Sequence, residues 1–371
     1  MRIDRVRMVQ VPLALMTPLR TSQGDHTTRT ATLVEITADD GTVGWGENVA
    51  PDGSFYTGES AAVSVAHMRD VVVPGLVNDS TEDDDDFGED FDDDTLPMAT
   101  HAVTSALADI DARQRGIALS AALGDAKVSQ VKVGAVVGLH PTVDAVLEEV
   151  MLRVSEGYTR IKVKIEPGRD VDVVRAVAGA LPHGVDLHVD ANGAYGSADI
   201  PHLAFLDTFD IGMVEQPFTA GDLESHARLS RAISTPVCLD ESVGDVVDAM
   251  RAVSTAACSV INVKPSRVGG FHEAVEILRL CAENGIDAWI GGMLESGIGR
   301  AGCLALATHP ACTFTPDLSA SSRYFARDVT EPFVLTDGCL QVPQGPGLGV
   351  TPLPWVLQDP SVTIETLFER S

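Results

Sequence analysis

The sequence predicts an α/β fold in which a barrel of parallel strands follows a smaller domain, and two patterns carry this prediction. The first is a spacing, because charged residues end successive short apolar runs at steps of 26, 25, 25 and 24 positions. One strand, one helix and their loops together occupy about 25 residues, so this spacing is typical of repeated βα units. The charged residues are Lys164, Asp190, Glu215, Asp240 and Lys264.

The second pattern is the alternation inside these runs. In RIKVK, Lys162 and Lys164 point to one face of the strand and Ile161 and Val163 to the other, because strand side chains alternate. Parallel strands that are covered on both faces are normally apolar throughout. In a barrel, the C-terminal strand ends form the mouth of the active site. The five charged residues are therefore predicted to converge at that mouth rather than to form unrelated salt bridges.

Composition limits the class of protein. The chain has 371 residues and a formal net charge of −28. That charge would repel phosphate backbones and anionic lipid, so neither nucleic acid nor a membrane is expected as a partner. The six cysteines are dispersed without a C-x-x-C pair and are expected to be buried thiols in a reducing compartment. The N-terminus lacks a small-residue cleavage site for export, so a cytoplasmic enzyme is expected.

The sequence patterns before the barrel predict a separate domain. Residues 1–60 alternate like antiparallel strands, with turns expected at Asp39–Gly41 and around Gly44–Gly46. Apolar residues at helical spacing predict a helical layer within Met98–Gly124. We therefore predict a first domain over residues 1–127.

The barrel is predicted to occupy residues 128–321. Its first strand is expected at Val131–Val133 and its last at Cys312–Thr315. The tail, residues 322–371, is rich in Pro and Gly and is expected to pack back on the first domain.

An acidic segment, Glu82–Asp94, carries ten acidic residues in thirteen positions. Such a run repels itself in a compact arrangement, so a solvated surface loop is expected. A calcium loop is the alternative, because Asp83, Asp85 and Gly88 fit the first, third and sixth positions of an EF-hand. Phe87 at the fifth position breaks that pattern.

The three central carboxylates, Asp190, Glu215 and Asp240, face one small volume and would raise one another's pKa unless a cation lay between them. A hard divalent cation resolves this conflict, so Mg²⁺ is expected, with Mn²⁺ as an alternative. Lys164 and Lys264 lie on the strands before and after these ligands. The two amines would thus flank a metal-chelated substrate carboxylate and exchange its α-proton from either face.

Further residues are predicted to contact substrate or to support the site. Lys162 shares the strand face of Lys164, and its like charge would favour the neutral, basic form of that amine. His188 is expected to be an interior histidine below the site.

The motif Gly297–Gly302 matches G-x-G-x-x-G, but its place late in the chain argues against a dinucleotide site. The remaining candidates are Asn192, Glu241, Arg267, Gly291, Gly292 and Met293.

Two other functions are compatible with single features. A barrel lysine could form a Schiff base, but that chemistry leaves three carboxylates without a role. A metal-stabilised binding or scaffold barrel would leave both lysines without a role.

At this point the chain resembles the muconate-cycloisomerase-like subgroup of the enolase superfamily. The resemblance rests on K-V-K, D-A-N, E-Q-P, D-E-S and K-P-S-R-V-G-G, which begin at residues 162, 190, 215, 240 and 264. Within the subgroup the chain is most similar to the N-acylamino acid racemase and o-succinylbenzoate synthase family. IKVKIEPG, GGMLESGIGR, TEPF and GPGLGV carry this similarity, which extends from about Leu19 to Pro354.

This resemblance implies a modified (β/α)7β TIM barrel and an α+β capping domain built from both chain ends. It implies that Lys164 and Lys264 are an acid/base pair and that Asp190, Glu215 and Asp240 bind the metal. It also implies a homo-oligomer, a mobile loop near Arg20–His26, and racemisation of N-succinylamino acids or synthesis of o-succinylbenzoate through an enediolate. Muconate cycloisomerisation and dipeptide epimerisation are the alternatives.

Three positions bear on the choice of substrate. Dipeptide epimerases carry Asp-x-Asp near the eighth strand, whereas this chain has only Asp317 followed by Leu318 and Ser319. Close relatives often have a hydroxyl residue where Val136 stands. Arg267 resembles the arginine of racemase-competent relatives, where its charge would tune Lys264; a surface arginine at a helix start is the alternative.

Overall fold

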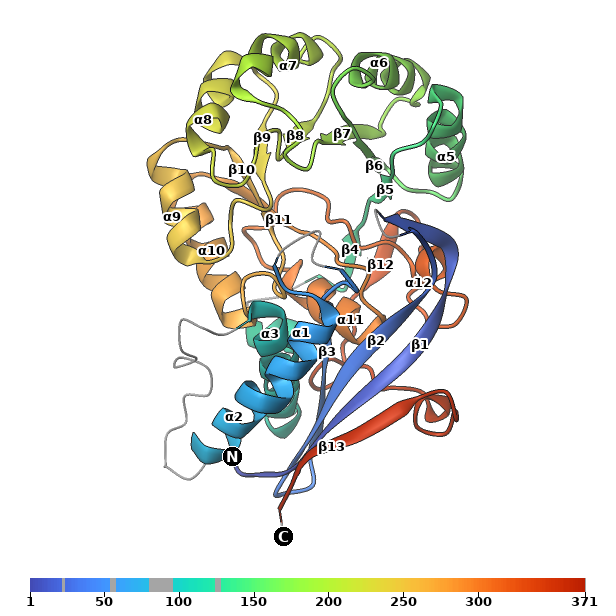
Figure 1. Ribbon diagram of the computed structural model, residues 1–371, viewed down its shortest axis with the longest axis vertical. Helices are drawn as coiled ribbons and strands as arrows, with labels where there is room; N and C mark the ends of the chain where they lie inside the picture. Colours follow the sequence, from blue (N-terminus) through green and yellow to red (C-terminus); the bar gives the residue numbers. More distant parts are fainter. Residues whose placement is uncertain (22–23, 54–57, 80–95, 124–127, 371) are drawn as a thin grey trace.

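The computed structural model describes residues 1–21, 24–53, 58–79, 96–123 and 128–370. An antiparallel sheet at one end of the molecule faces a curled parallel sheet at the other (Figure 1). The antiparallel sheet has the strand order β13-β1-β2-β3. Its strands are β1 (Ile3–Thr21), β2 (Gly24–Ala38), β3 (Val43–Asn48) and β13 (Thr363–Glu369).

The strand β13 lies next to β1, with Arg5 opposite Glu369. The predicted return of the tail to the first part of the chain is thus confirmed, as is the fold class. The domain boundaries at residues 127 and 321 stay predictions.

Helices cover one face of the antiparallel sheet: α1 (Ala61–His67), the π-helical turn η1 (Met68–Val72), α2 (Val73–Asp79) and α3 (Pro97–Gln114). The short helix α4 (Leu119–Leu123) follows α3. The buried side chains of α3 and those of β1 and β2 form one apolar cluster.

The turn expected around Gly44–Gly46 is wrong, because these residues belong to the strand β3. The glycines are there for packing. A Cβ atom on Gly44 or Gly46 would lie only 2.2 or 2.0 Å from a carbonyl oxygen of α3, so the helix touches the strand backbone at these two positions.

The parallel sheet has the order β11-β10-β9-β8-β7-β6-β5. Each strand is preceded or followed by a helix, and the helices form an outer layer around the curled sheet (Figure 1). The strands are β5 (Ala135–Val137), β6 (Arg160–Lys164), β7 (Asp186–Asp190), β8 (Met213–Glu215), β9 (Val237–Leu239), β10 (Val260–Val263) and β11 (Asp287–Ile290).

The outer helices begin where the sequence supplies a cap. Thr142, Asp222 and Asp245 each accept a hydrogen bond from a backbone N–H in the first turn of the helix that follows. Gly285, at a φ of 68°, ends α10. The helices are α5 (Val143–Ser155), α6 (Asp170–Ala180), α7 (Ile200–Leu206), α8 (Leu223–Ala232), α9 (Val246–Ser254), α10 (Phe271–Asn284) and α11 (Gly297–Leu306).

Short elements complete the described chain. The strand β4 (Gln130–Lys132) pairs antiparallel with β12 (Cys339–Gln341) in a separate two-stranded sheet. The first barrel strand expected at Val131–Val133 is therefore wrong. The returning tail, and not a barrel strand, pairs with this segment. The remaining short elements are the helical turns η2 (Ser197–Asp199), α12 (Ser321–Tyr324) and η3 (Pro354–Leu357).

The last barrel strand expected at Cys312–Thr315 forms only one isolated bridge, from Cys312 to Ala288. This segment nevertheless fills the gap between β11 and β5. The Asp317 amide donates to Ile290 on one side at 3.2 Å, and Gly134 donates to Pro316 on the other at 2.9 Å. The ring is thus closed by loop hydrogen bonds in place of an eighth strand.

Two expectations fall on residues outside the described ranges. The acidic segment Glu82–Asp94 is one of them. The other is the loop expected near Arg20–His26, of which residues 22–23 are not described; the flanking backbone belongs to β1 and β2. None of the helices in the described ranges is long and apolar enough to cross a membrane. All six cysteines are free thiols, and five of them are buried.

Candidate active site

The five residues of the 25-residue rhythm meet at the C-terminal ends of consecutive strands, as predicted. Lys164, Asp190 and Glu215 end β6, β7 and β8 and lie side by side in the strand register. Asp240 and Lys264 directly follow β9 and β10. The three carboxylates are almost fully buried, and the alternation of the strands turns them to one interior.

Lys162 lies at the centre of the carboxylates. Its Nζ is 2.6 Å from Glu215, 2.7 Å from Asp317 and 3.1 Å from Asp190, and it lies 5.0 Å from the centre of the Trp289 ring. Burial works against the charge, but the surrounding carboxylates outweigh it and raise the pKa of Lys162 well above its usual range. Lys162 is therefore a fixed cation.

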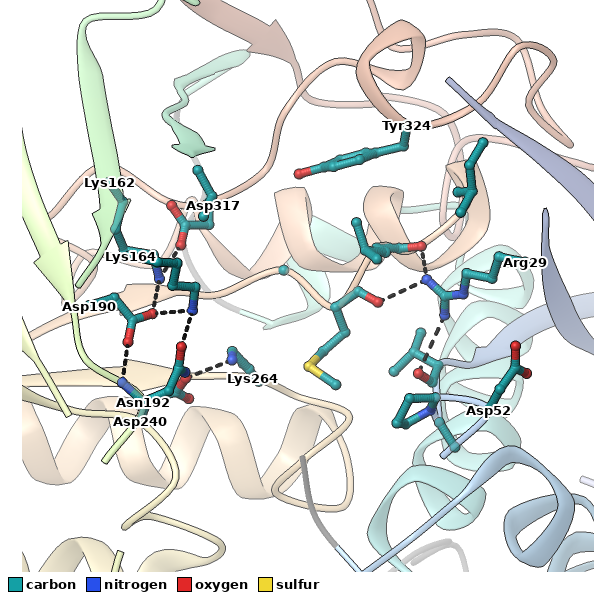
Figure 2. Close-up of a pocket in the computed structure, with 18 of the residues that line it drawn as sticks. Arg29, Asp52, Lys162, Lys164, Asp190, Asn192, Asp240, Lys264, Asp317 and Tyr324 are labelled. Carbon is teal, nitrogen blue, oxygen red and sulfur yellow. Dashed lines mark hydrogen bonds and ion pairs between the residues drawn. The ribbon is translucent and has the colours of Figure 1, made fainter. Parts of the chain in front are cut away.

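The two candidate bases come from the strands on either side of those that carry the carboxylates, and Figure 2 shows Lys164 beside Asp190 and Lys264 beside Asp240. Lys164 Nζ lies 2.7 Å from Asp190 Oδ2 and 2.6 Å from Asn192 Oδ1. Lys264 Nζ lies 2.8 Å from Asp240 Oδ2. The strands β7, β8 and β9 separate the two lysines.

The carboxylates differ in electrostatic surroundings. Burial opposes ionisation of Asp190, but Lys164 and Lys162 outweigh it and lower its pKa to about 2. Burial likewise opposes ionisation of Asp240, and Lys264 and Arg267 still lower its pKa. By contrast, burial and the neighbouring Asp190 raise the pKa of Glu215 to about 8 against the attraction of Lys162.

Asn192 and Glu241 support the site from the loops behind the strands. The Asn192 amide donates to Glu241 Oε1 at 2.9 Å, and its oxygen accepts from Lys164. Burial and Asp240 raise the pKa of Glu241. Gln216, which the sequence reasoning missed, binds the Asp240 backbone N–H through Oε1 at 2.8 Å. The E-Q-P and D-E-S motifs are thus joined by one side chain.

Arg267 is buried, so the surface-arginine alternative is wrong. Its guanidinium contacts Asp240 and donates to the Val243 carbonyl oxygen at 2.9 Å. Since Lys264 binds the other oxygen of Asp240, a single carboxylate lies between both cations.

The glycines after β11 allow close approach of the backbone, but their neighbours are protein groups. A Cβ on Gly291 would lie 2.6 Å from Lys264 Cε, and one on Gly292 would lie 2.6 Å from the Asp317 carbonyl oxygen. Gly292 and Met293 line the cavity; Gly291 lies behind them against Lys264.

Asp317 belongs to the charged network of the site, which its sequence motif did not indicate. Its carboxylate forms an ion pair with the buried Arg160 and a second with Lys162. Burial opposes ionisation of Asp317, but Arg160 and Lys162 outweigh it and hold its pKa below the usual range. Asp317 is not one of the five regularly spaced charged residues, so the spacing could not predict its place in the site.

A cavity of about 660 Å³ opens over these groups. The antiparallel sheet and the loop after β3 supply one wall, which includes Leu15, Arg29 and residues 49–53. Residue spacing offered no signal for this wall, because the wall lies far along the chain from the barrel motifs; only the family resemblance implied a capping domain. Val136, Arg323 and Tyr324 also line the cavity.

His188 has a structural role, as predicted, and the glycine motif forms the start of a helix. His188 lies below the site beside Phe314, and burial together with Arg160 lowers its pKa to about 3. The motif Gly297–Gly302 begins α11, whose N-terminus is bound by the Glu47 carboxylate at Ser296 and Gly299. A protein carboxylate thus occupies the position where a dinucleotide phosphate would bind.

The donor set fits a hard divalent cation, because three buried carboxylate side chains converge there. Within the described ranges, no three His, Cys, Asp or Glu side chains already form a metal-binding group. Lysine amines bond to oxygens of all three carboxylates. The metal assignment stays a prediction.

Comparison with known proteins identifies the family. The model of the enolase C-terminal domain-like family matches residues 145–355, and that of the mandelate racemase / muconate lactonizing enzyme N-terminal domain matches residues 3–124. The chain is 41% identical to an o-succinylbenzoate synthase of Geobacillus kaustophilus over 94% of this chain and 92% of that protein. It is 39% identical to an N-succinylamino acid racemase of Amycolatopsis sp over 97% of each.

Solved structures agree with this relationship. A member of the enolase superfamily from Enterococcus faecalis V583 superposes with a TM-score of 0.90 at 36% identity, over 99% of this chain and 100% of that one. A dipeptide epimerase of Cytophaga hutchinsonii, solved with Mg and a dipeptide, shares the fold with a TM-score of 0.86 at 23% identity, over 99% and 100% of the two chains. The resemblance stated from the motifs is confirmed. The chain belongs to the enolase superfamily, in its mandelate racemase / muconate lactonizing enzyme subgroup, and is an enzyme that abstracts a proton α to a carboxylate.

Proposed function

We propose that this enzyme racemises N-succinylamino acids and that it also forms o-succinylbenzoate. The observation that carries the racemase is the placement of Lys164 and Lys264 on opposite flanks of the carboxylates, each within 2.8 Å of one of them. Two bases on opposite faces of one α-carbon are what inversion requires. The synthase is supported by relatives of that name at up to 41% identity, since elimination needs only one of the two bases.

Asp190, Glu215 and Asp240 would hold a divalent metal, Mg²⁺ with Mn²⁺ as the alternative. When bound, the metal supplies positive charge beside the substrate carboxylate, where negative charge develops as the α-proton leaves. Lys162 holds a second, fixed positive charge at the same place.

The chain's own residues move the proton. One lysine takes the α-proton from its face, and the other delivers a proton to the opposite face, which inverts the centre. In the synthase reaction one lysine takes the α-proton and the C–H electron pair becomes the second bond of the new C=C. The C–O bond breaks, and the protonated lysine returns its proton to the departing hydroxide, which leaves as water. Arg267 and Asn192 keep Asp240 and Lys164 in position through the contacts described above.

The alternatives are less well supported. The Asp317 carboxylate is engaged by Arg160 and Lys162, which argues against its holding a dipeptide amine. A muconate cycloisomerase of Rhodococcus opacus is 27% identical, well below the synthases and racemases. A cytoplasmic homo-oligomer stays a prediction.

The test is incorporation of solvent deuterium at the α-carbon of L- and D-N-succinylamino acids with Mg²⁺ present. We expect exchange from both enantiomers in the wild type. Lys164→Ala and Lys264→Ala should each lower the rate of exchange by roughly 10²–10⁴-fold, each for a different enantiomer. Lys132→Ala, on the exposed β4, is the matched control and should exchange normally. Absence of exchange from every N-succinylamino acid in the wild type would exclude the racemase, and o-succinylbenzoate formation is assayed separately.

A further inference from the structure

One arginine of the antiparallel sheet reaches the wall of the substrate cavity. Arg29 lies on β2 opposite Leu13 of β1, and its side chain lines the cavity. Figure 2 shows its guanidinium across the cavity from the three lysines, bonded to backbone carbonyl groups rather than to an acid. Its contacts therefore differ from those of the other cavity cations, which pair with carboxylates.

The carbonyl groups belong to two chain segments that are far apart in sequence. Arg29 Nη1 donates to the Met293 carbonyl oxygen at 2.8 Å and to the Leu294 carbonyl oxygen, and Nη2 donates to the Val49 carbonyl oxygen at 3.3 Å. Val49 begins the cap side of the cavity wall, and residues 292–294 form the barrel side. A planar guanidinium can bond several acceptors at fixed angles, so one side chain sets the distance between both sides.

The barrel side of this wall needs such an anchor. Residues 291–296 have no helical or strand structure, and Leu294 has a φ of 62°, a conformation that a branched side chain disfavours. Within the segment, the Met293 amide bonds to Glu295 Oε1 at 2.6 Å. The next anchor is Glu47 of β3, which accepts from the Ser296 amide at 2.9 Å. The antiparallel sheet thus holds the middle of the segment through Arg29 and its last residue through Glu47.

The same segment borders a catalytic lysine. An added Cβ on Gly291 would lie 2.6 Å from Lys264 Cε, so no free space separates the start of the segment from that base. Movement of the wall would therefore change both the shape of the cavity and the room around Lys264.

We propose that Arg29 is a positioning residue: by joining the carbonyl groups of Val49, Met293 and Leu294, it fixes the cavity wall and thereby sets the affinity for substrate. The kinetic part of this proposal rests on the proposed function, whereas its structural part does not. Arg29 acts through the wall and takes no part in proton transfer.

The experiment compares Arg29→Met and Arg29→Lys with Arg7→Met in the full-length enzyme. Arg7 is a matched control, because it lies in the same sheet and pairs with Glu35 at 2.6 Å outside the cavity. We expect Arg29→Met to raise KM for an N-succinylamino acid about tenfold or more, the effect of losing a charge-assisted hydrogen bond, with a smaller change in kcat. The KM of Arg29→Lys should lie between those of the wild type and Arg29→Met, and the KM of Arg7→Met should match that of the wild type.

Amide hydrogen exchange without substrate provides the second readout. Peptides that cover residues 291–299 should exchange faster in Arg29→Met, while those covering β6–β8 keep wild-type protection. Unchanged protection of 291–299, or equal loss of protection throughout the barrel, would overturn the proposal, as would a KM within about twofold of wild type. If Arg29→Met does not fold, Arg29→Lys decides by the same measurements. If the wild type acts on no N-succinylamino acid, the proposed function fails and the exchange data still decide the role of Arg29.

Discussion

Arg160 and Asp317 form an ion pair beneath the substrate cavity, and both side chains are almost completely buried. Arg160 begins β6, whereas Asp317 belongs to the segment that closes the ring between β11 and β5. Arg160 also donates to the Thr315 carbonyl oxygen at 2.8 Å and lies 5.4 Å from the centre of the Trp289 ring. This pair therefore connects the closure of the barrel with the charge balance of the site.

Removal of the Asp317 charge should strongly destabilise the fold. In Asp317→Asn, Arg160 and Lys162 would both lose a buried partner, and breaking a buried pair from one side costs about 3–5 kcal/mol. The free energy of unfolding in urea measures the loss. Asp172→Asn is the control, because its carboxylate is 74% exposed and its pairing with Arg175 contributes little. A loss below about 1 kcal/mol would contradict this account.

Mg²⁺ should stabilise the wild type and not Glu215→Gln. A ligand that binds only the folded state adds about 2.7 kcal/mol at a hundred times its Kd, which a thermal melt detects as a higher Tm. Excess EDTA should return the wild type to its metal-free Tm. An equal rise in Tm for both proteins would place the ion elsewhere.

Acid should destabilise the protein through His101. This side chain of α3 is buried, with its ring 5.2 Å from that of Phe271 on α10, and burial lowers its pKa to about 4. The unfolded chain binds the proton at about pH 6.5, so folding free energy is lost as the pH falls from about 6.5 to about 4, up to on the order of 3 kcal/mol. Above that window the histidine is neutral in both states and the effect vanishes.

Unfolding in urea at pH 7 and at pH 4.5 measures this effect. His101→Gln should show a smaller difference between the two pH values than the wild type does. His183→Gln, at an exposed position, should keep the wild-type difference. Equal pH dependence in all three proteins would refute the role of His101.

Gly46→Ala should force α3 away from β3. The added methyl carbon would lie 2.0 Å from the Ala102 carbonyl oxygen, and overpacking of this kind costs about 1–3 kcal/mol or more. Gly75→Ala is the matched comparison, because nothing lies within 4 Å of its added methyl and α2 should gain about 0.5–1 kcal/mol. Melting temperatures should therefore move in opposite directions. A Gly46→Ala variant as stable as the wild type would show that the helix can shift freely.

The sequence was sufficient for the centre of the site because strand geometry repeats. Lys164, Asp190 and Glu215 recur with the period of one βα unit, and strand alternation determines which way each side chain points. Period and alternation together place these charges at one end of the barrel without any knowledge of long-range contacts.

Where long-range contacts decide, the sequence was insufficient. The glycines at 44 and 46 suggested a turn because local preference cannot show that a helix about 60 residues later lies against them. The short run Val131–Val133 has the apolar character of a barrel strand, and only its pairing with Cys339–Gln341 assigns it to another sheet. Arg29 and Asp317 belong to no periodic pattern, so only the folded chain shows their contacts.

The segment that closes the ring has a consequence for how related enzymes can diverge. In a paired strand, a one-residue insertion turns every following side chain to the opposite face. Residues 313–317 are held by individual hydrogen bonds instead of a continuous ladder, so insertions and exchanges there leave the register of the seven strands intact. Evolution can thus alter the cavity beside Asp317 while Lys164 and Lys264 stay where they are.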